Sequence, residues 1–277
     1  MQYKLWIIEY AYIPDQPLGS ILLGRHNGGT RMFPMTYCVA QSREHNIMID
    51  VGTNHQGKKS LAMQKRDHIQ NWHGPDELLR TINLRPEDID TIILTHAHFD
   101  HIDNLDAFPN AAVYLQKKEY YESKHSLSLD IKYQSLNKAL NYEDFDVLDK
   151  LLHENRLQLI DGDVKDLLPG ISVYPSYYGH SFASQSVVVD GCDGNRYVCV
   201  GDLVYSIDNY TASEDGSYTP VGLSVGTPMA LMRAMDDVLH LAGNDYRKIL
   251  IAHEPRNWEN YSTVLLENGL HIATICN

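Results

Sequence analysis

The chain has 277 residues, of which 43% are hydrophobic and 21% are charged, a balance that excludes a disordered chain and a coiled coil. Its formal net charge of −13 argues against nucleic acid or an anionic membrane as a partner, because both attract basic surfaces. No apolar run is long enough to cross a bilayer, so we expect no membrane association.

The cysteines and the N-terminus indicate the compartment. None of the four cysteines forms a CxxC pair, a usage that favours a reduced, cytoplasmic protein. They are Cys38, Cys192, Cys199 and Cys276. The first 16 residues are interrupted by Glu9 and Tyr10 and lack a clear small-residue cleavage site, so we interpret them as a first strand and not as a signal peptide.

The first half of the chain opens with a block of strands. β-Branched and aromatic residues between turn signals predict strands at 3–13, 36–42 and 46–52. A helix is predicted at 74–84, because Pro75 suits a first helical turn and apolar residues follow at helical spacing. A strand is expected at 91–95.

Helices and strands alternate in the second half. Helices are predicted at 116–125 and 142–155, and strands at 157–161, 171–176, 184–190 and 196–202. After a polar loop at 211–220, the pattern predicts a long helix at 228–243, a strand at 248–254 and a closing helix at 258–269. A block of strands followed by alternating helices and strands indicates a protein of the α/β class.

Histidine and aspartate residues stand at the ends of four of the predicted strands. The strand at 91–95 runs into the segment THAHFDH, and three later strands run into single residues of the same kinds. The complete set is His96, His98, Asp100, His101, His180, Asp202 and His253. Ligands of α/β sheets bind beyond the carboxyl ends of the strands, so we expect these side chains to meet at one edge.

The composition of this set predicts a metal site. Imidazoles and carboxylates without a thiolate suit zinc, iron or manganese. Seven ligands are too many for one tetrahedral ion, so we expect two divalent ions, zinc first among them, that share one carboxylate. The chain has 14 histidines, and the nine outside the set are assigned to the surface or to packing; they include His26, His45, His68, His125 and His271.

The motif and its downstream partners resemble the metallo-β-lactamase superfamily. The resemblance rests on THAHFDH followed in order by Gly179–His180, Gly201–Asp202 and Ala252–His253. It implies a four-layer αββα sandwich, formed by residues 1–277 as one domain, with a dinuclear metal site at one edge. Within the superfamily, the absence of cysteine ligands, the chain length and Tyr205, three residues after Asp202, are most similar to the N-acyl homoserine lactonases and related lactone hydrolases.

The resemblance also implies a role for each residue. One ion would take His96, His98 and His180, the other would take Asp100, His101 and His253, and Asp202 would bridge them. Asp50 matches an aspartate that steadies a ligand. A metal-bridging hydroxide would attack the lactone carbonyl, with Tyr205 stabilising the oxyanion and Asp100 passing a proton to the leaving alkoxide. A homodimer is implied by the resemblance only.

The sequence departs from the family just after the motif. Ile102, Asp103 and Asn104 stand where the family usually has small residues, so the turn beside the substrate pocket is expected to differ. The expected pocket lining is apolar and aromatic, with Met32, Phe33, Met35, Phe99, Tyr178, Ile207 and Tyr210 as candidates. The segment 116–155 is long for a connection and suits a lid, a dimer surface or a plain solvated face.

Two other functions compete with a lactone hydrolase. The same site could act on a thioester, a cyclic imide or amide, or a phosphodiester, but the stretches that flank the motif are poor in Lys and Arg, which anionic substrates would need. The chain could also bind metal as a sensor without turnover. Metal binding without hydrolysis of any ester or lactone would favour that reading.

Overall fold

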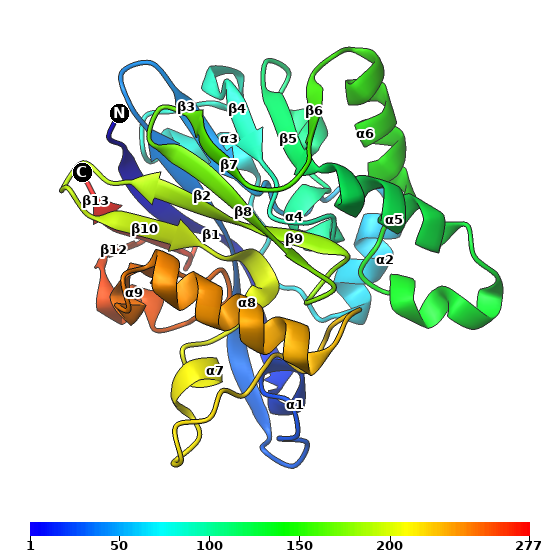
Figure 1. The fold of residues 1–277 in the computed structure, drawn as a ribbon. Coiled ribbons are helices and arrows are strands. Elements are labelled where there is room, and N and C mark those ends of the chain that lie inside the picture. The colour runs from blue at the N-terminus through cyan, green and yellow to red at the C-terminus, as the bar shows by residue number, and fades with distance from the viewer.

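Two β-sheets stack face to face in the computed structural model, which describes residues 1 to 277 (Figure 1). The first sheet has eight strands, in the order β12 (Ser262–Leu265), β13 (His271–Cys276), β1 (Lys4–Pro17), β2 (Thr30–Gln41), β3 (Asn46–Ile49), β4 (Thr91–Ile93), β5 (Ala112–Gln116) and β6 (Leu157–Ile160). The second has five, in the order β11 (Ile249–Leu250), β10 (Arg196–Cys199), β9 (Ala183–Asp190), β8 (Ile171–Tyr177) and β7 (Val164–Leu168).

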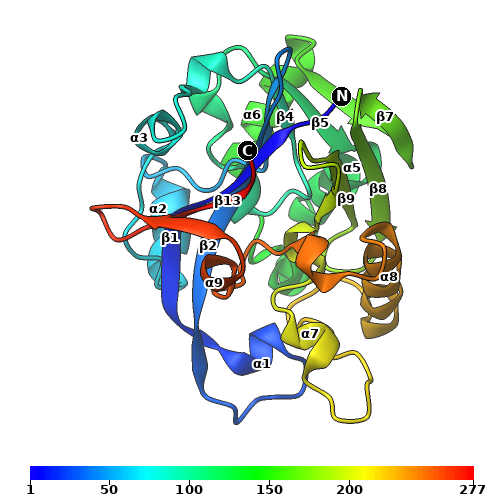
Figure 2. The same cartoon turned by 90° about the vertical axis from the view of Figure 1, so that its left-hand side faces the viewer.

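Helices cover the outer faces of both sheets. Figure 2 shows α3 on the outer side of the first sheet and α8 on the outer side of the second, which confirms the predicted αββα sandwich. The helices are α1 (Leu18–Ile21), α2 (Lys58–Arg66), α3 (Pro75–Arg80), α4 (Phe99–Ile102), α5 (Lys117–Leu127), α6 (Tyr142–His153), α7 (Asp208–Thr211), α8 (Pro228–Leu241) and α9 (Asn257–Asn260). None of them combines the length and the apolar character that a bilayer crossing requires.

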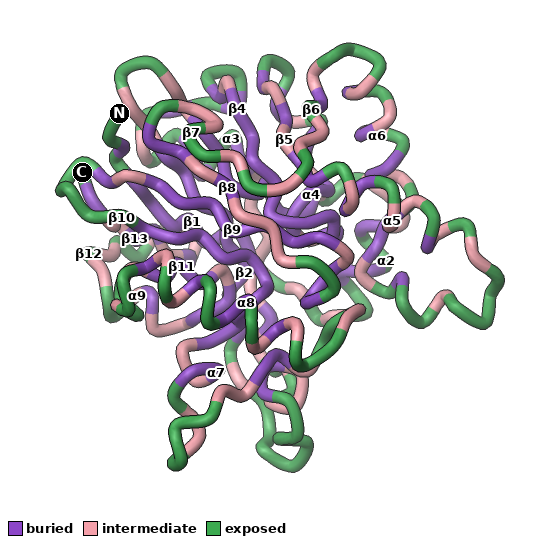
Figure 3. Tube along the Cα trace, viewed as in Figure 1, coloured by how far each residue is buried: buried purple, intermediate pink, exposed green.

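Alternating strand residues build two separate apolar layers. Leu5 and Ile7 of β1 belong to a cluster between the sheets, whereas Trp6 and Ile8 belong to the larger cluster beneath the outer helices. Successive side chains of a strand point to opposite faces, so a strand buried on both faces is apolar throughout. The buried trace in Figure 3 runs through the strands of both sheets accordingly.

The predicted closing helix at 258–269 is wrong. Only Asn257–Asn260 is helical, and the chain then forms the hairpin of β12 and β13. The turn of this hairpin contains Gly269 with φ +83°, and β13 pairs antiparallel with β1 at the other end of the chain. The sequence analysis also missed β5, β7 and the helices α1, α2, α4 and α7.

The other predicted elements are present with shifted ends, and the loop at 211–220 overlaps the end of α7 only at Thr211. The segment after residue 116 forms α5, a 3₁₀ turn at Ile131–Asn137 and α6, and Figure 1 shows the 3₁₀ part projecting from the body of the molecule. All four cysteines are free thiols.

Candidate metal centre

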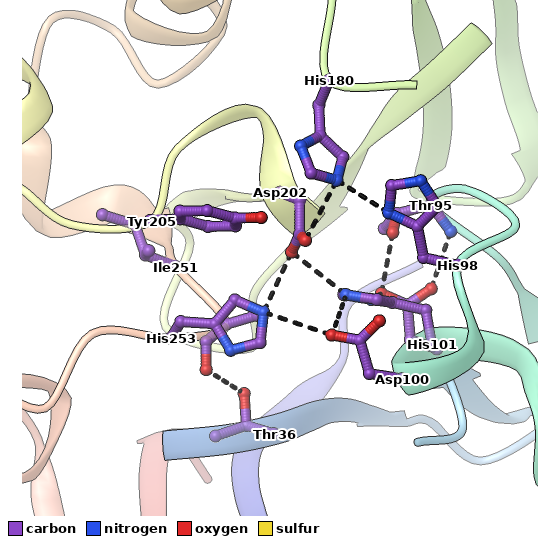
Figure 4. A network of polar contacts seen from close by, with 12 residues as sticks. Thr36, Thr95, His98, Asp100, His101, His180, Asp202, Tyr205, Ile251 and His253 are labelled. Atoms are coloured by element: carbon purple, nitrogen blue, oxygen red, sulfur yellow. Dashed lines mark hydrogen bonds and ion pairs between the residues drawn. The ribbon is translucent and has the colours of Figure 1, made fainter. Parts of the chain in front are cut away.

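The sheet topology brings the ends of four strands to one edge. β10 and β11 are parallel, with Cys199 paired to Leu250, so the residues three positions further on, Asp202 and His253, lie beside each other. β8 runs antiparallel to β9 and β9 antiparallel to β10, which places the end of β8 and His180 at the same edge. All seven metal-ligand candidates meet there, as Figure 4 shows for six of them.

The seven side chains form two groups that share Asp202. We call His96, His98 and His180 the first half-site. We call Asp100, His101 and His253 the second half-site. Within each group, completed by Asp202, the candidate ligand atoms all lie within 4.8 Å of one another.

Asp202 uses one carboxylate oxygen for each half-site. Its Oδ2 lies 3.2 Å from His180 Nε2 and 3.8 Å from His96 Nε2. Its Oδ1 lies 3.0 Å from the Nε2 atoms of both His101 and His253. Asp202 is therefore placed to bridge two ions, as the resemblance implies.

Hydrogen bonds at Nδ1 fix the tautomers of two histidines, so that the unprotonated Nε2 atom of each ring faces this centre. The Nδ1 of His253 donates to the carbonyl oxygen of Pro34 at 2.8 Å, and that of His180 donates to Leu223 at 3.0 Å. A carbonyl oxygen only accepts, so the proton sits on Nδ1 and Nε2 is free to bind a metal. His98 differs, because it is its Nδ1 that points inward, 2.9 Å from His180 Nε2.

Two of the inward-facing atoms are buried without a hydrogen bond. These are the Nε2 atoms of His96 and His101, the second of which lies 3.0 Å from Asp202 Oδ1, and such burial is costly unless something else binds them. Burial and the neighbouring imidazoles lower the pKa of His96 well below its usual range, so that this ring is neutral. Imidazoles converging with carboxylate oxygens fit a pair of divalent cations.

Asp50 supports the second half-site from behind. Its Oδ2 lies 2.7 Å from His101 Nδ1, and its oxygens also accept hydrogen bonds from the backbone and side chain of Thr95. Asp50 has φ +62°, a left-handed conformation that aspartate tolerates better than most residues. This is the place that the resemblance implies for it.

Gly201 allows the two sheets to approach at the site. Its φ is +51°, and a Cβ atom there would lie 2.5 Å from the side-chain oxygen of Thr95. Any larger residue would push the end of β10, with Asp202, away from the end of β4.

Tyr205 lies against both half-sites. Its ring packs edge-on to His180, His253 and Phe33, and Figure 4 shows its hydroxyl pointing toward Asp202. Burial, followed by the charges of Asp202 and Asp100, raises the pKa of Tyr205 well above its usual range. The hydroxyl therefore keeps its proton and can donate a hydrogen bond.

Buried polar residues hold the loop of Tyr205. The side-chain oxygen of Asn209 accepts the backbone N–H groups of Tyr205 and Ser206, at 3.0 and 2.9 Å. Glu254, next to His253, accepts hydrogen bonds from Ser206 and Ile207 and thereby joins this loop to the end of β11. Neither residue was singled out from the sequence, since nothing local distinguishes them from other polar loop residues.

A cavity of about 450 Å³ opens beside the centre. Three predicted lining residues, Phe33, Met35 and Phe99, are in its wall together with Tyr205. The prediction is wrong for the other four. Met32 and Tyr178 are exposed, Tyr210 is buried with its hydroxyl on the Met235 carbonyl, and Ile207 is absent from the wall; more distant segments supply Ile13, Ile69, Leu136, Leu223 and Val225.

The wall also contains basic residues that the sequence analysis did not group. Arg66 comes from the end of α2 and Lys138 follows the 3₁₀ turn. Arg66 is occupied by Asp67 and by the carbonyl oxygen of Lys138. The exposed Lys138 ammonium is in no ion pair of the structure. These residues are far apart in sequence, so only the fold brings them together.

The residues after the motif lie at the end of α4. Ile102 ends α4, and Asp103 accepts hydrogen bonds from the backbone and side chain of Asn54. Asp103 thus fastens the end of α4 to the segment after β3.

Comparisons with known proteins agree on the fold. The family model of the metallo-beta-lactamase superfamily matches residues 30–253. An N-acyl homoserine lactonase of Bacillus cereus is 25% identical over 170 residues, which cover 61% of this chain. The match spans only 58% of the length of that relative.

Two solved structures resemble the whole chain in fold. One is an N-acyl homoserine lactone hydrolase with N-hexanoyl-L-homoserine bound at its catalytic metal centre; it has a TM-score of 0.68, 17% identity, and coverage of 95% of this chain and 98% of its own. The other is a dizinc quorum-quenching lactonase, with a TM-score of 0.63, 19% identity, and coverage of 97% and 96%. Because the family model spans most of its length, the chain belongs to the metallo-beta-lactamase superfamily.

Proposed function

We propose that the protein is a dinuclear-metal-dependent hydrolase that opens a lactone ring, in an N-acyl homoserine lactone or a related lactone. The observation that carries the proposal is the pair of half-sites joined by Asp202, with a cavity beside them. The Bacillus cereus relative is a lactonase, and one similar fold holds a lactone hydrolysis product at its metal centre. We infer that residues 1–277 act as one domain.

Each half-site would hold one ion. His96, His98 and His180 would bind the first and Asp100, His101 and His253 the second, with Asp202 between them. We propose zinc, since one relative in fold is a dizinc enzyme and the ligand set has no thiolate. When bound, two such ions supply a lowered pKa of water and polarisation of the lactone carbonyl.

The protein groups would complete the reaction. Water adds to the carbonyl carbon, the ring C–O bond breaks, and the ring oxygen leaves as a hydroxyl that needs one proton. The Tyr205 hydroxyl would donate a hydrogen bond to the carbonyl oxygen as negative charge develops there. Asp100 lines the cavity and would take the proton that the attacking water loses and transfer it to the leaving oxygen.

The cavity would bind the acyl part of the substrate. Ten of its 20 lining residues are hydrophobic, so an aliphatic chain would remove apolar surface from water on binding. The apolar wall is built from segments far apart in the sequence, among them β1, β2 and residues 223–225.

Metal analysis combined with a lactonase assay tests the proposal. We expect about two ions per chain by elemental analysis, and proton release from a panel of acyl homoserine lactones and simple γ- and δ-lactones. His98→Ala should lower both the metal content and the turnover. Two bound ions without lactone turnover would overturn the substrate assignment, and no bound metal would overturn the whole proposal.

A second candidate function is favoured by Lys138. Lys138 lies in the cavity wall and its ammonium group is in no ion pair, which suits an anionic substrate such as a phosphodiester or a charged thioester. The Lys138→Ala substitution distinguishes an anionic substrate from an uncharged lactone. It would raise KM for an anionic substrate and leave KM for an uncharged lactone unchanged.

A further inference from the structure

Glu119 is a fully buried carboxylate that the proposed reaction does not use. It lies in the first turn of α5, where the partial positive charge of a helix N-terminus favours an acidic side chain. It touches none of the seven candidate ligands directly. Its two oxygens instead bind the backbone and side-chain donors of the loops that carry the first half-site.

Three hydrogen bonds make this connection. Glu119 Oε1 accepts from the backbone N–H of Ala97 at 3.0 Å. Glu119 Oε2 accepts from the hydroxyl of Ser181 at 2.8 Å and from the backbone N–H of Ala183 at 2.6 Å. Ala97 stands between His96 and His98, and Ser181 directly follows His180, so one carboxylate holds the two loops that supply all three ligands.

A buried polar bridge fixes the same two loops next to Glu119. Gln185 of β9 donates from its backbone to the Thr95 carbonyl oxygen at 2.7 Å and from its side chain to the Leu94 carbonyl oxygen at 2.7 Å. Gln116, at the start of α5, donates to the Gln185 side chain at 2.9 Å. The end of β4 in the first sheet and the start of β9 in the second are thus joined through buried side chains.

We propose that Glu119 is a positioning residue that sets the geometry of the first half-site alone, as Asp50 does for the second. The proposal rests on the metal centre of the proposed function. Asp50 acts directly on the ring of His101, whereas Glu119 acts through the backbone on either side of His96, His98 and His180. Loss of either carboxylate therefore weakens a different ion.

The Glu119→Gln substitution tests this assignment with little change in shape. An amide has one acceptor oxygen and one donor nitrogen, so it cannot accept from Ala97 and Ala183 together. One buried N–H group is left without an acceptor, and one ligand loop moves. Glu122→Gln in the same helix is the matched control, because Glu122 pairs with Lys118 at the surface.

Zn²⁺ affinity is measured in two backgrounds that each retain one intact half-site. In His253→Ala, where only the first half-site keeps its ligands, Glu119→Gln should raise the Kd for Zn²⁺ about 10- to 100-fold. In His98→Ala, where only the second remains intact, it should leave the Kd unchanged. Glu119→Gln should also change the visible spectrum of the bound Co²⁺ in the His253→Ala background, and should leave it unchanged in the His98→Ala background.

Equal weakening in both backgrounds, or no weakening in either, would overturn the proposal. If Glu119→Gln does not fold, Ser181→Ala removes one of the three hydrogen bonds and should weaken Zn²⁺ binding selectively, in the His253→Ala background only. These measurements do not depend on a substrate. Zn²⁺ binding without lactone turnover would reject the lactonase assignment and leave the Glu119 test valid, whereas no Zn²⁺ binding by the unsubstituted protein would overturn both.

Discussion

The two half-sites share Asp202 but differ in chemistry and in support. The first consists of three imidazoles on two loops, held through the backbone by Glu119. The second contains the carboxylate of Asp100, and a further carboxylate, Asp50, binds directly to one of its rings. An ion in the second half-site would therefore meet more negative charge close by than an ion in the first.

This difference places the two proposed ions in unlike surroundings at one edge of the sandwich. The second half-site has Asp100 and His101 on the short helix α4 and His253 after β11, where Thr36 of β2 donates to the carbonyl oxygen before His253. The first half-site depends on a loop from each sheet, and both loops need a common anchor. Substitutions that affect the two unequally test this comparison.

The largest effect is expected when the shared ligand is removed. Asp202→Ala takes away the carboxylate that faces all four Nε2 atoms, so both ions should be lost. Elemental analysis should find well below one ion per chain, and lactone turnover should fall to background. His253→Ala is the control, since it should retain about one ion; retention of two ions by Asp202→Ala would contradict the bridging role.

Tyr205→Phe should separate chemistry from metal binding. The hydroxyl would act on the developing oxyanion, and loss of one such donor lowers kcat by about 100- to 1,000-fold in other hydrolases. The metal content should stay at two ions, because the ring remains packed against His180 and His253. Steady-state kinetics with metal analysis on the same sample checks this. A fall in metal content equal to the fall in kcat would assign Tyr205 a structural role.

Asp50→Asn should weaken the second half-site and spare the first. Asparagine keeps the left-handed backbone of residue 50 but loses the charge that faces His101 Nδ1. Loss of such a partner lowers metal affinity about 10- to 100-fold. Zn²⁺ titration in the His98→Ala background should show this loss, and titration in the His253→Ala background should not. The reverse pattern would contradict the comparison of the half-sites.

The strand ends could be predicted from the sequence because they follow from local patterns. Short apolar runs that stop at His96, His180, Asp202 and His253 reveal both the strands and the edge where they end. Parallel pairing of β10 with β11 then places Asp202 beside His253, as the general rule for α/β sheets predicts. These local patterns predict an α/β protein with a site at one edge, whereas the αββα arrangement follows from the resemblance to the superfamily.

The missed features depend on contacts between distant residues. The pattern at 258–269 has apolar residues that suit a helix, but pairing of β13 with β1 selects a hairpin instead. Glu119 stands in a helix rich in charged residues, and only the fold shows that it is buried. Lys138 lies in the cavity wall because of the path of the segment between α5 and α6, which no local spacing could reveal.

The smallest effect is expected when Asp208 loses its ion pairs with Arg31 and Arg256, close to the second half-site. Asp208 accepts hydrogen bonds from Arg31 at 2.7 Å and from Arg256 at 3.0 Å, joining β2, the loop after Tyr205 and the segment after His253. Burial opposes ionisation of Asp208, but the two guanidinium groups overcome it and lower the pKa of this carboxyl. The folded state therefore binds a proton here less readily than the unfolded chain does.

Asp208→Asn should lower the free energy of unfolding by about 1 kcal/mol at pH 7, because the pair is partly exposed and solvent screens it. Because the pKa of Asp208 is lower in the folded protein, its charge stabilises the fold at pH values above the unfolded pKa of about 4. This stabilisation is lost as the pH falls through the folded pKa. The difference between the two proteins should therefore shrink between about pH 4 and pH 2, as measured by urea unfolding. A difference that stays constant over this range would show that Asp208 acts through packing and not through its charge.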